Sequence, residues 1–398
     1  MKHDNRSTSL AAAWAINSLA YSIVYPFIPI YLHEERNIPM DVVGTIFPLM
    51  GLAVILAPPV SGWLTDRIGR RFMMQFGQSS RAALFLILAA LAFLQAPFWL
   101  FAVILMINAG VGTFFQVAAD SYLTDLTTPE ERPRVYSKIR IGTNIGWAVG
   151  PMLGAFLART PFSLMFAITA ILCMAGTFYT GHCCREVPQA VSAASKAEDK
   201  STVWSILRNS TLLKLLISSF LLFLLTSQLY SVLSVYATGV VGVSRDTLGL
   251  VYSVNGFTII FFQLPVTQLL DRIRMHQSLR LLSGAALYAL GYFSLAFCTG
   301  GWSLGTAVFV LTLGEVIVQP ALFTQVSRLA PQGGVGRSMA TLGLVRGIGM
   351  AVGPWIGSLV FQSYSGAPLI LWGILSSFAV IAGIGFLTMR TASRQQTN

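Results

Sequence analysis

Residues 41–68 are repeated without a gap at residues 246–273, and this internal repeat limits the fold more than any other feature. At a constant offset of 205, 8 of the 28 positions are identical, and they include Asp, Arg and Gly as well as apolar residues. The repeat closes with Asp66-Arg67-Ile68 against Asp271-Arg272-Ile273. The chain is therefore predicted to contain one structural unit that is built twice.

The composition places these units in a lipid bilayer. Apolar residues make up 55% of the 398 residues, charged residues only 10%, and the mean hydropathy is +0.69. Soluble domains carry about 25% charged residues, so this chain has too little charge to cover a soluble surface. We therefore expect an integral membrane protein.

Twelve stretches are long and apolar enough to cross the hydrocarbon core as helices, for which roughly 20 residues are needed. Helices are expected because a segment in lipid must satisfy its own backbone N–H and C=O groups. The predicted fold class is thus all-α integral membrane, with 12 transmembrane helices. The predicted spans are 9–32, 42–64, 73–95, 97–119, 137–158, 162–184, 211–236, 247–270, 277–298, 302–325, 338–361 and 367–389.

The distribution of basic residues predicts the orientation. Of the 26 Lys and Arg residues, only Arg36, Arg159 and Arg245 fall in the loops that follow odd-numbered spans. Cytoplasmic loops are enriched in Lys and Arg, so we expect both termini to lie in the cytoplasm. The protein is expected to be a multi-pass protein of a bacterial cytoplasmic (inner) membrane. The net charge of +11 then reflects topology and contact with anionic membrane lipid rather than nucleic-acid binding.

A polar segment divides the chain into halves. Residues 186–206 lack apolar periodicity and are rich in Ala, Ser and charged residues, which is typical of a linker. We expect an N-terminal six-helix bundle at 1–185, a cytoplasmic linker at 186–206 and a C-terminal six-helix bundle at 207–398. An even number of spans lets the second half insert in the orientation of the first, which makes the repeat parallel. Two tyrosine pairs at the same offset, Tyr25/Tyr230 and Tyr31/Tyr236, support the duplication.

Two short motifs carry a resemblance to a known family. Residues 62–71, GWLTDRIGRR, lie between the spans 42–64 and 73–95. Residues 146–154 follow the pattern G-x-x-x-G-P-x-x-G. The first motif resembles the signature loop of the major facilitator superfamily, and the second resembles its antiporter motif. The whole chain is most similar to the multidrug-efflux branch, the proton antiporters, with one departure: Met106 stands where drug exporters carry an arginine.

The resemblance implies that the loop motifs form a conformational latch on the cytoplasmic side. Asp66 would face the N-terminus of the helix at 338–361, where the helix dipole favours an anion. Arg70 would pair with Asp125 at the foot of the span 97–119. The alternative is that these charges only mark a cytoplasmic turn. The residues assigned to the latch are Gly62, Asp66, Arg67, Gly69, Arg70, Asp125, Asp271 and Arg272.

Rows of glycines in two spans predict close helix packing. Glycine has no side chain, so a neighbouring helix can approach closely, and an internal proline removes a backbone donor and permits a bend. Such a row serves either as a hinge or sliding surface, or as a static packing seam. The residues are Gly142, Gly146, Gly150, Pro151 and Gly154, with Gly349, Gly353, Pro354 and Gly357 in the second half.

A single acid lies deep inside a predicted span. Glu315 is a candidate for proton coupling, because an ionisable group inside the membrane is costly and indicates a functional site. Counting about 1.5 Å per residue, Arg346 lies at a similar depth in the span 338–361. A structural ion pair between the two residues is the alternative to proton transfer.

The candidate substrate surface combines aromatic and neutral polar side chains. Three of these recur at four-residue spacing on one face of the span 9–32. A few neutral polar groups on apolar walls suit a lipophilic or weakly cationic compound, although for each residue packing or an interhelix hydrogen bond is the simpler role. The candidate substrate-binding residues are Asn17, Tyr21, Tyr25, Gln116, Asn144, Gln228, Tyr230 and Gln319.

These features predict a secondary active transporter that works by alternating access, with proton-coupled efflux of small hydrophobic or weakly cationic compounds as the favoured function. The alternatives are a transporter of one specific metabolite, by import or export, and a non-transporting membrane receptor on the same fold. An enzyme is not expected, because the sequence has no clustered catalytic groups, phosphate-binding loop or metal-ligand spacing. We expect no cofactor and no metal. The partners would be a small-molecule substrate, protons and membrane lipid, and the protein would act as a monomer.

Overall fold

The computed structural model describes residues 2–128, 131–184, 209–331 and 334–395. These residues form helices joined by short connections, and no strand occurs in them. The all-α fold class is therefore confirmed. The predicted linker at 186–206 lies outside the described residues.

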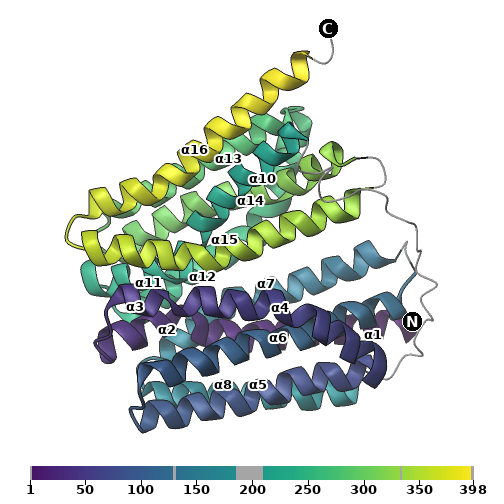
Figure 1. The fold of residues 1–398 in the computed structure, drawn as a ribbon, viewed down its shortest axis with the longest axis vertical. Coiled ribbons are helices and arrows are strands. Elements are labelled where there is room, and N and C mark those ends of the chain that lie inside the picture. Colours follow the sequence, from purple (N-terminus) through teal and green to yellow (C-terminus); the bar gives the residue numbers. More distant parts are fainter. Residues whose placement is uncertain (1, 129–130, 185–208, 332–333, 396–398) are drawn as a thin grey trace. The chain divides into compact units, whose positions relative to one another are not determined.

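The first of two compact units contains the chain up to Ser192 together with Ser244–Gly256. Within it α1 packs against α7, α5 against α8, and α4 against α6 (Figure 1). A buried apolar cluster that includes Met74, Phe115 and Tyr122 joins α1, α5, α6 and α7. The elements are α1 (Lys2–Val24), η1 (Tyr25–Phe27), α2 (Ile28–Ile30), η2 (Tyr31–Glu35), α3 (Met40–Gly44), α4 (Ile46–Ile68), α5 (Arg70–Phe93), α6 (Phe98–Leu126), α7 (Arg132–Leu157) and α8 (Phe162–Cys183).

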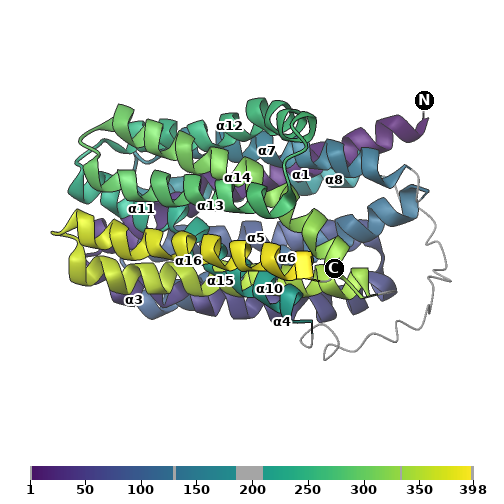
Figure 2. The same cartoon turned by 90° about the horizontal axis from the view of Figure 1, so that it is seen from above.

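The second unit contains Ala193–Val243 and the chain from Phe257 onward. Here α13 packs against both α14 and α16, and α10 packs against α15 and α16 (Figure 2). The elements are α10 (Ser210–Thr226), η3 (Ser227–Tyr230), α11 (Val232–Val235), η4 (Tyr236–Val240), α12 (Arg245–Arg272), α13 (Gln277–Ser294), η5 (Leu295–Phe297), α14 (Gly301–Leu329), α15 (Val335–Tyr364) and α16 (Pro368–Gln395). The helix α12 thus begins in the first unit and continues in the second.

In the described part of the chain, eleven segments are long and apolar enough to cross a membrane. The interrupted helices that open each half form one segment each, Arg6–Glu35 and Ser210–Val240. The twelfth is α7, a helix of 26 residues that is less apolar because it begins with several basic residues and carries the glycine row. The twelve predicted spans are all present as helices, in the predicted order.

The two halves share their backbone irregularities residue for residue. A π-helical turn occupies Tyr31–Glu35 in the first half and Tyr236–Val240 in the second, which is the predicted offset of 205. In both halves the residue after the turn donates its N–H to the carbonyl of the first tyrosine, at 3.1 Å and 3.0 Å. π-helical turns are rare, so their matching positions support the duplication that the sequence predicts.

Left-handed backbone positions are repeated in the same way. Asn37 (φ 51°) and Gly242 (φ 76°) stand 205 residues apart, and so do Gly69 (φ 112°) and Arg274 (φ 49°). With ψ at 149°, Gly69 occupies a region that is essentially restricted to glycine. Arg274 keeps a left-handed turn in the second half, at a cost of roughly 1 kcal/mol for a residue with a side chain.

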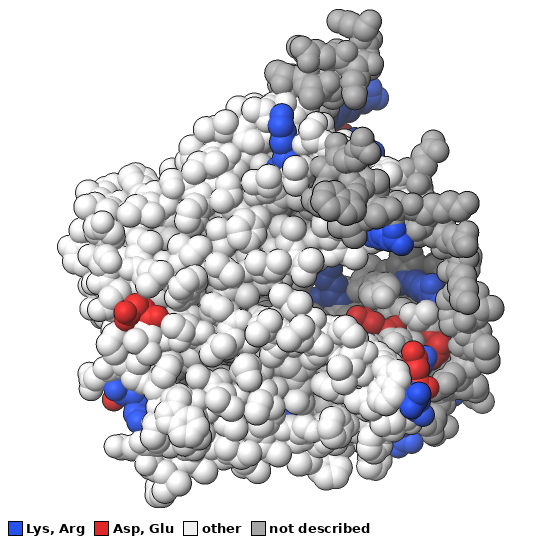
Figure 3. Space-filling model, in the orientation of Figure 1, with Lys and Arg blue, Asp and Glu red and all other residues white. Residues whose placement is uncertain are grey.

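Charged side chains are sparse on the face drawn in Figure 3 and gather towards the helix ends. Many large apolar side chains are exposed along the helices, among them Phe93, Phe261 and Trp302. Extended exposed apolar surface marks a surface that contacts another phase or partner. Together with the length of the helices, it fits contact with lipid acyl chains.

The strained backbone at Gly69 gives a test of the fold. Replacing Gly69 with Ala should lower the free energy of unfolding by about 1–3 kcal/mol, because a Cβ is poorly tolerated at this φ and ψ. The check is the midpoint of thermal unfolding of the purified protein in detergent. Arg274→Gly is the matched control and should leave the midpoint unchanged or raise it. An equal loss in both variants would contradict the assignment of strain.

Candidate functional site

The loop between α4 and α5 is held by the guanidinium of Arg70. Its Nη1 lies 2.7 Å from Asp66 Oδ1 and donates to the Thr65 carbonyl at 2.8 Å, and its Nε donates to Asp125 Oδ2 at 3.0 Å. The side chains of Arg70 and Asp125 are only 13% and 7% exposed, whereas Asp66 is 70% exposed. The predicted Arg70–Asp125 pair is therefore present and shielded. The predicted contact of Asp66 with the start of α15 stays a prediction.

The second copy of the loop uses an arginine that sequence comparison missed. Arg280 Nη1 lies 2.7 Å from Asp271 Oδ1, and its Nη2 donates to the Leu270 carbonyl at 2.9 Å. Leu270 stands 205 residues after Thr65, so each arginine contacts the motif aspartate and the carbonyl that precedes it. Arg280 comes from α13, five residues further along than Met275, the position equivalent to Arg70. Both loops therefore contain an Arg–Asp ion pair, although the arginine of the second loop stands at a different position in the repeat.

The glycine row of α7 packs directly on the backbone of α1. A Cβ at Gly142 would come within 2.6 Å of the Ala11 carbonyl oxygen, and one at Gly146 within 2.8 Å of the Leu19 nitrogen. Ser22 Oγ donates to the Gly146 carbonyl at 2.9 Å and fixes the register. The same conflict would arise further along the row at Gly150 and Gly154. A tight seam is thus present, and whether it also acts as a hinge stays a proposal.

The glycine row of α15 forms the corresponding seam with α10 and η3. A Cβ at Gly349 would meet Phe223 Cβ at 2.7 Å, and one at Gly353 would meet the Leu224 carbonyl oxygen at 2.6 Å. Gln228 is fully buried here, and its Nε2 donates to the carbonyls of Gly353 at 2.8 Å and Leu224 at 2.7 Å. Gln228, a candidate for substrate contact, therefore bridges two helices in this structure.

A second seam lies on the other side of α7, where the first half of α12 packs. A Cβ at Gly249 would come within 2.8 Å of the Pro151 carbonyl oxygen, and one at Gly256 within 3.0 Å of the Ala148 nitrogen. Between these glycines, Ser253 Oγ donates to the Ala148 carbonyl at 3.0 Å. The helix α7 is thus packed through small residues on two sides.

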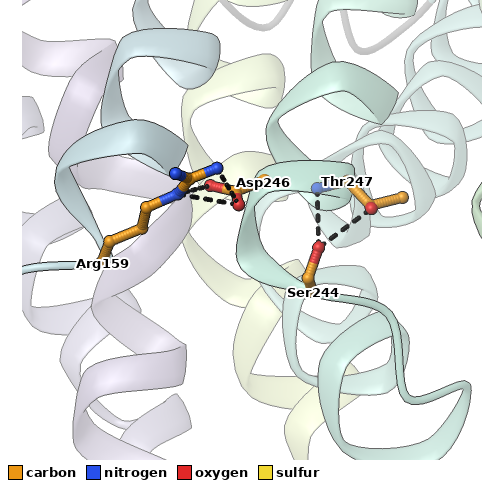
Figure 4. A network of polar contacts seen from close by, with 4 residues as sticks. All are labelled: Arg159, Ser244, Asp246 and Thr247. Atoms are coloured by element: carbon orange, nitrogen blue, oxygen red, sulfur yellow. Dashed lines mark hydrogen bonds and ion pairs between the residues drawn. The ribbon is translucent and has the colours of Figure 1, made fainter.

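Ion pairs close the end of this second seam, and we call them the outer clasp: Arg159–Asp246 and Arg245–Glu35. Arg159 forms three hydrogen bonds to the two carboxylate oxygens of Asp246, at 2.6–2.9 Å (Figure 4). Arg245 Nη1 lies 2.9 Å from Glu35 Oε1 and also donates to the Ala158 carbonyl at 3.0 Å. The hydrogen bonds to Asp246 raise the pKa of Arg159 above its ordinary value. Both arginines belong to the few that the sequence places in odd-numbered loops.

An aromatic surface is formed by α1, η1, α4 and α7. The rings of Tyr21 and Tyr25 stack with centroids 4.9 Å apart, and Trp147 lies edge-on to both at 6.0 Å and 6.2 Å. Phe47 lies edge-on to Tyr25 at 6.3 Å. Tyr21, Tyr25 and Trp147 are half-buried, so part of each ring is accessible. The structure thus joins two predicted residues with Trp147, which the sequence did not single out.

The other candidate substrate residues are dispersed. Asn17 is 8% exposed, and its Oδ1 accepts a hydrogen bond from Arg81 Nη1 at 2.9 Å. Gln116 is exposed on α6. Half-buried side chains are found at the remaining positions, Asn144, Tyr230 and Gln319.

The second unit carries Glu315, Arg346 and Tyr288 on three different helices. Tyr288 is fully buried on α13. Glu315 is half-buried on α14, and Arg346 is exposed on α15, with its guanidinium 5.9 Å from the Phe223 ring centroid. The similar depth of the two charges and their ion pair stay predictions.

The fold and these motifs define the chain as a membrane transporter. A family model described as "Major Facilitator Superfamily" matches residues 10–354. The chain therefore belongs to the major facilitator superfamily, and it is a transporter rather than an enzyme. Among the described residues, no group of three or more His, Cys, Asp or Glu side chains is placed to hold a metal ion.

Similar proteins include an uncharacterized transporter and two multidrug resistance proteins. The uncharacterized MFS-type transporter YttB of Bacillus subtilis is 24% identical, covering 96% of this chain and 95% of its own length. The multi-drug resistance efflux pump PmrA of Streptococcus pneumoniae is 26% identical, covering 90% and 91%. The multidrug resistance protein MdtG of Escherichia coli is 26% identical, covering 96% and 92%. The crystal structure of the nucleoside transporter NupG shares the fold, with a TM-score of 0.79 at 14% identity over 97% of this chain and 99% of that one.

The outer clasp can be tested by its effect on access to the α7–α12 seam. Arg159→Ala should increase the labelling rate of a cysteine placed at Ala155 by about twofold to fivefold, because an exposed ion pair contributes modestly to closure. The assay uses a variant without the native cysteines in membrane vesicles. The exchange Arg159→Asp with Asp246→Arg should restore the slow rate. Equal labelling in all three proteins would show that the clasp does not hold the seam closed.

Proposed function

We propose that this protein is a proton-coupled exporter of small, mainly hydrophobic compounds that works by alternating access. The observation that carries the proposal is Glu315, a half-buried acid on α14, a helix long and apolar enough to cross a membrane. An ionisable group at such a position marks an ion or proton pathway. The names of PmrA and MdtG as multidrug resistance proteins support export. A monomer with both termini in the cytoplasm is part of the proposal.

The aromatic surface of Tyr21, Tyr25 and Trp147 supports the substrate class. Partly accessible rings supply apolar area with few polar groups, as binding sites for lipophilic compounds do. The sequence also predicts weakly cationic substrates. The buried guanidinium of Arg81, 5.1 Å from the Tyr21 ring centroid, opposes that part of the prediction.

The glycine seams and the arginine-containing loops support the alternating-access part of the proposal. We propose that the glycine seams of α7 and α15 are the surfaces about which the helices adjust, and that the Arg70 and Arg280 loops hold the cytoplasmic ends of the helices. The pairs with the exposed carboxylates Asp66 and Asp271 suit this role, because a partly exposed ion pair can break at little cost. The polar linker at 186–206 would join the halves at 1–185 and 207–398.

The latch is tested by Asp66→Asn. This variant keeps the size of the side chain and removes the charge that pairs with Arg70, so we expect normal expression and ligand binding with transport lost. Uptake into inverted membrane vesicles is the measurement. Glu131→Gln, an exposed acid next to α7, is the control and should transport normally. Full transport by Asp66→Asn would exclude the latch.

Proton coupling is tested by Glu315→Gln in proteoliposomes with an imposed pH gradient and a panel of unrelated hydrophobic dyes. We expect transport driven by the gradient to fall to the level of empty liposomes, because glutamine has no proton to exchange. Energy-independent exchange of substrate should persist, since the path itself is intact.

The same assay separates the alternatives. Gradient-driven transport that survives in Glu315→Gln would assign Glu315 to a structural ion pair. Transport of a single compound from the panel would favour a specific metabolite transporter. Ligand binding without any flux in the wild type would favour a receptor.

A further inference from the structure

The first unit contains a buried arginine that has no acidic partner. Arg81 on α5 is 3% exposed, and its guanidinium lies over the rings of Tyr21 and Phe85, at 5.1 Å and 5.9 Å from their centroids. Among the described residues, its hydrogen-bond acceptor is the neutral amide oxygen of Asn17, at 2.9 Å. Among the described residues, no carboxylate lies within ion-pairing distance of Arg81. The positive charge is therefore not neutralised locally.

Other buried donors around Arg81 also have no acceptor. Arg81 Nε, Gln78 Nε2 and Asn108 Nδ2 are all buried and unpartnered. Gln78 is one helical turn from Arg81 on α5. Asn108 is one turn from Gly112 on α6, and a Cβ at Gly112 would lie 3.7 Å from Arg81 Nη1. The seam that α5 forms with α6 and α8 thus combines a positive charge with buried hydrogen-bond donors that have no acceptor among the described residues.

This seam lies directly behind the aromatic surface. Tyr21 contacts the guanidinium of Arg81 and also stacks on Tyr25 and packs against Trp147. A ligand on the accessible side of these rings is separated from the charge by little more than one side chain. At a distance of about 8 Å and an effective dielectric constant of about 20, one unit charge changes the affinity for another by more than tenfold.

We propose that Arg81 sets the charge preference of this transporter, so that it takes small lipophilic compounds with one acidic group, such as a carboxylate or an acidic phenol, and disfavours cations. The inference rests on the proposed function, whose substrate class it narrows. The acidic group binds at the Asn17–Tyr21 edge of the aromatic surface, where Arg81 and the amide donors compensate its charge. Arg81 acts through Asn17 and Tyr21 and is a specificity determinant.

The test compares three compounds on one aromatic scaffold: 1-naphthaleneacetate, 1-naphthaleneacetamide and (1-naphthylmethyl)trimethylammonium. Their binding to the full-length protein in lipid nanodiscs is measured by tryptophan fluorescence at neutral pH, with empty nanodiscs as the blank. The wild type should bind the carboxylate more than about tenfold tighter than the cation, with the amide between them. Arg81→Gln should remove this order and leave the affinity for the amide within about twofold.

Two further variants separate charge from packing. Arg81→Lys keeps the charge and should keep the order of the three compounds. Arg134→Gln removes an exposed arginine from the first turn of α7 and should also keep it. A loss of affinity in Arg81→Gln that is equal for all three compounds would assign Arg81 a structural role and overturn the proposal.

If Arg81→Gln does not fold, the affinities of the wild type for the three compounds are sufficient to test the charge preference. Equal or tighter binding of the cation than of the carboxylate overturns the charge preference. If the amide is exported under a pH gradient without any preference for the carboxylate, the inference fails and the export function stands. If none of the three compounds binds, the inference fails. If in addition no compound of the dye panel is transported, the proposed function fails as well.

Discussion

Backbone contact between α1 and α7 is the constraint on which the rest of the first unit depends. A Cβ at Gly146 would meet Leu19 and Ser18, so the spacing of the two helices is accessible only to glycine at this position. In lipid, the helices gain no hydrophobic energy by associating, and close packing supplies the attraction instead. The short spacing also brings Trp147, the neighbour of Gly146, against Tyr21 and Tyr25. The glycine row therefore determines where the aromatic surface forms.

The second unit uses the same contact with different chemistry. Position 23 is isoleucine in the first half, and its counterpart at the repeat offset is Gln228. The helix that carries Gln228 is interrupted near Ser231, whose backbone (φ −127°, ψ −87°) is not helical. Interrupted helices in lipid need new partners for the freed backbone groups. Gln228 supplies a donor to two carbonyls there, which explains why a polar residue is fully buried at this position.

The fold could be predicted from the sequence, because hydropathy and the repeat report on the environment of whole segments. All twelve spans are present, although helices such as α6 and α14 run on to Leu126 and Leu329, beyond the predicted ends at 119 and 325. Amphipathic helix ends that leave the hydrocarbon carry polar residues, and hydropathy does not detect them.

Side-chain partners were less accessible to prediction. The Arg70–Asp125 pair could be expected from the resemblance, whereas Arg280 could not, because it reaches Asp271 from a shifted position in sequence. Asn17 has the residue type of a ligand contact, but its oxygen accepts a hydrogen bond from Arg81, which lies 64 residues further along the chain. A single sequence does not indicate which distant residues come into contact. Such contacts depend on three-dimensional packing, and only a specific motif such as residues 62–71 predicts them from sequence.

The charges on the membrane-spanning helices are distributed differently in the two units. In the second unit a positive and a negative charge are present, with Arg346 exposed on α15 and Glu315 half-buried on α14. In the first unit Arg81 donates to the amide oxygen of Asn17 and lies over two aromatic rings, and no carboxylate of the described residues lies within ion-pairing distance of it. An unpaired cation inside a membrane segment costs on the order of 3 kcal/mol, and Arg81 bears this cost next to the aromatic surface. The second unit thus carries Glu315 on a membrane-spanning helix, whereas the first carries the buried cation Arg81. Under the proposed function, a substrate at the aromatic surface and a proton at Glu315 would act on separate halves, which is a physical basis for coupling their movements without direct competition for one site.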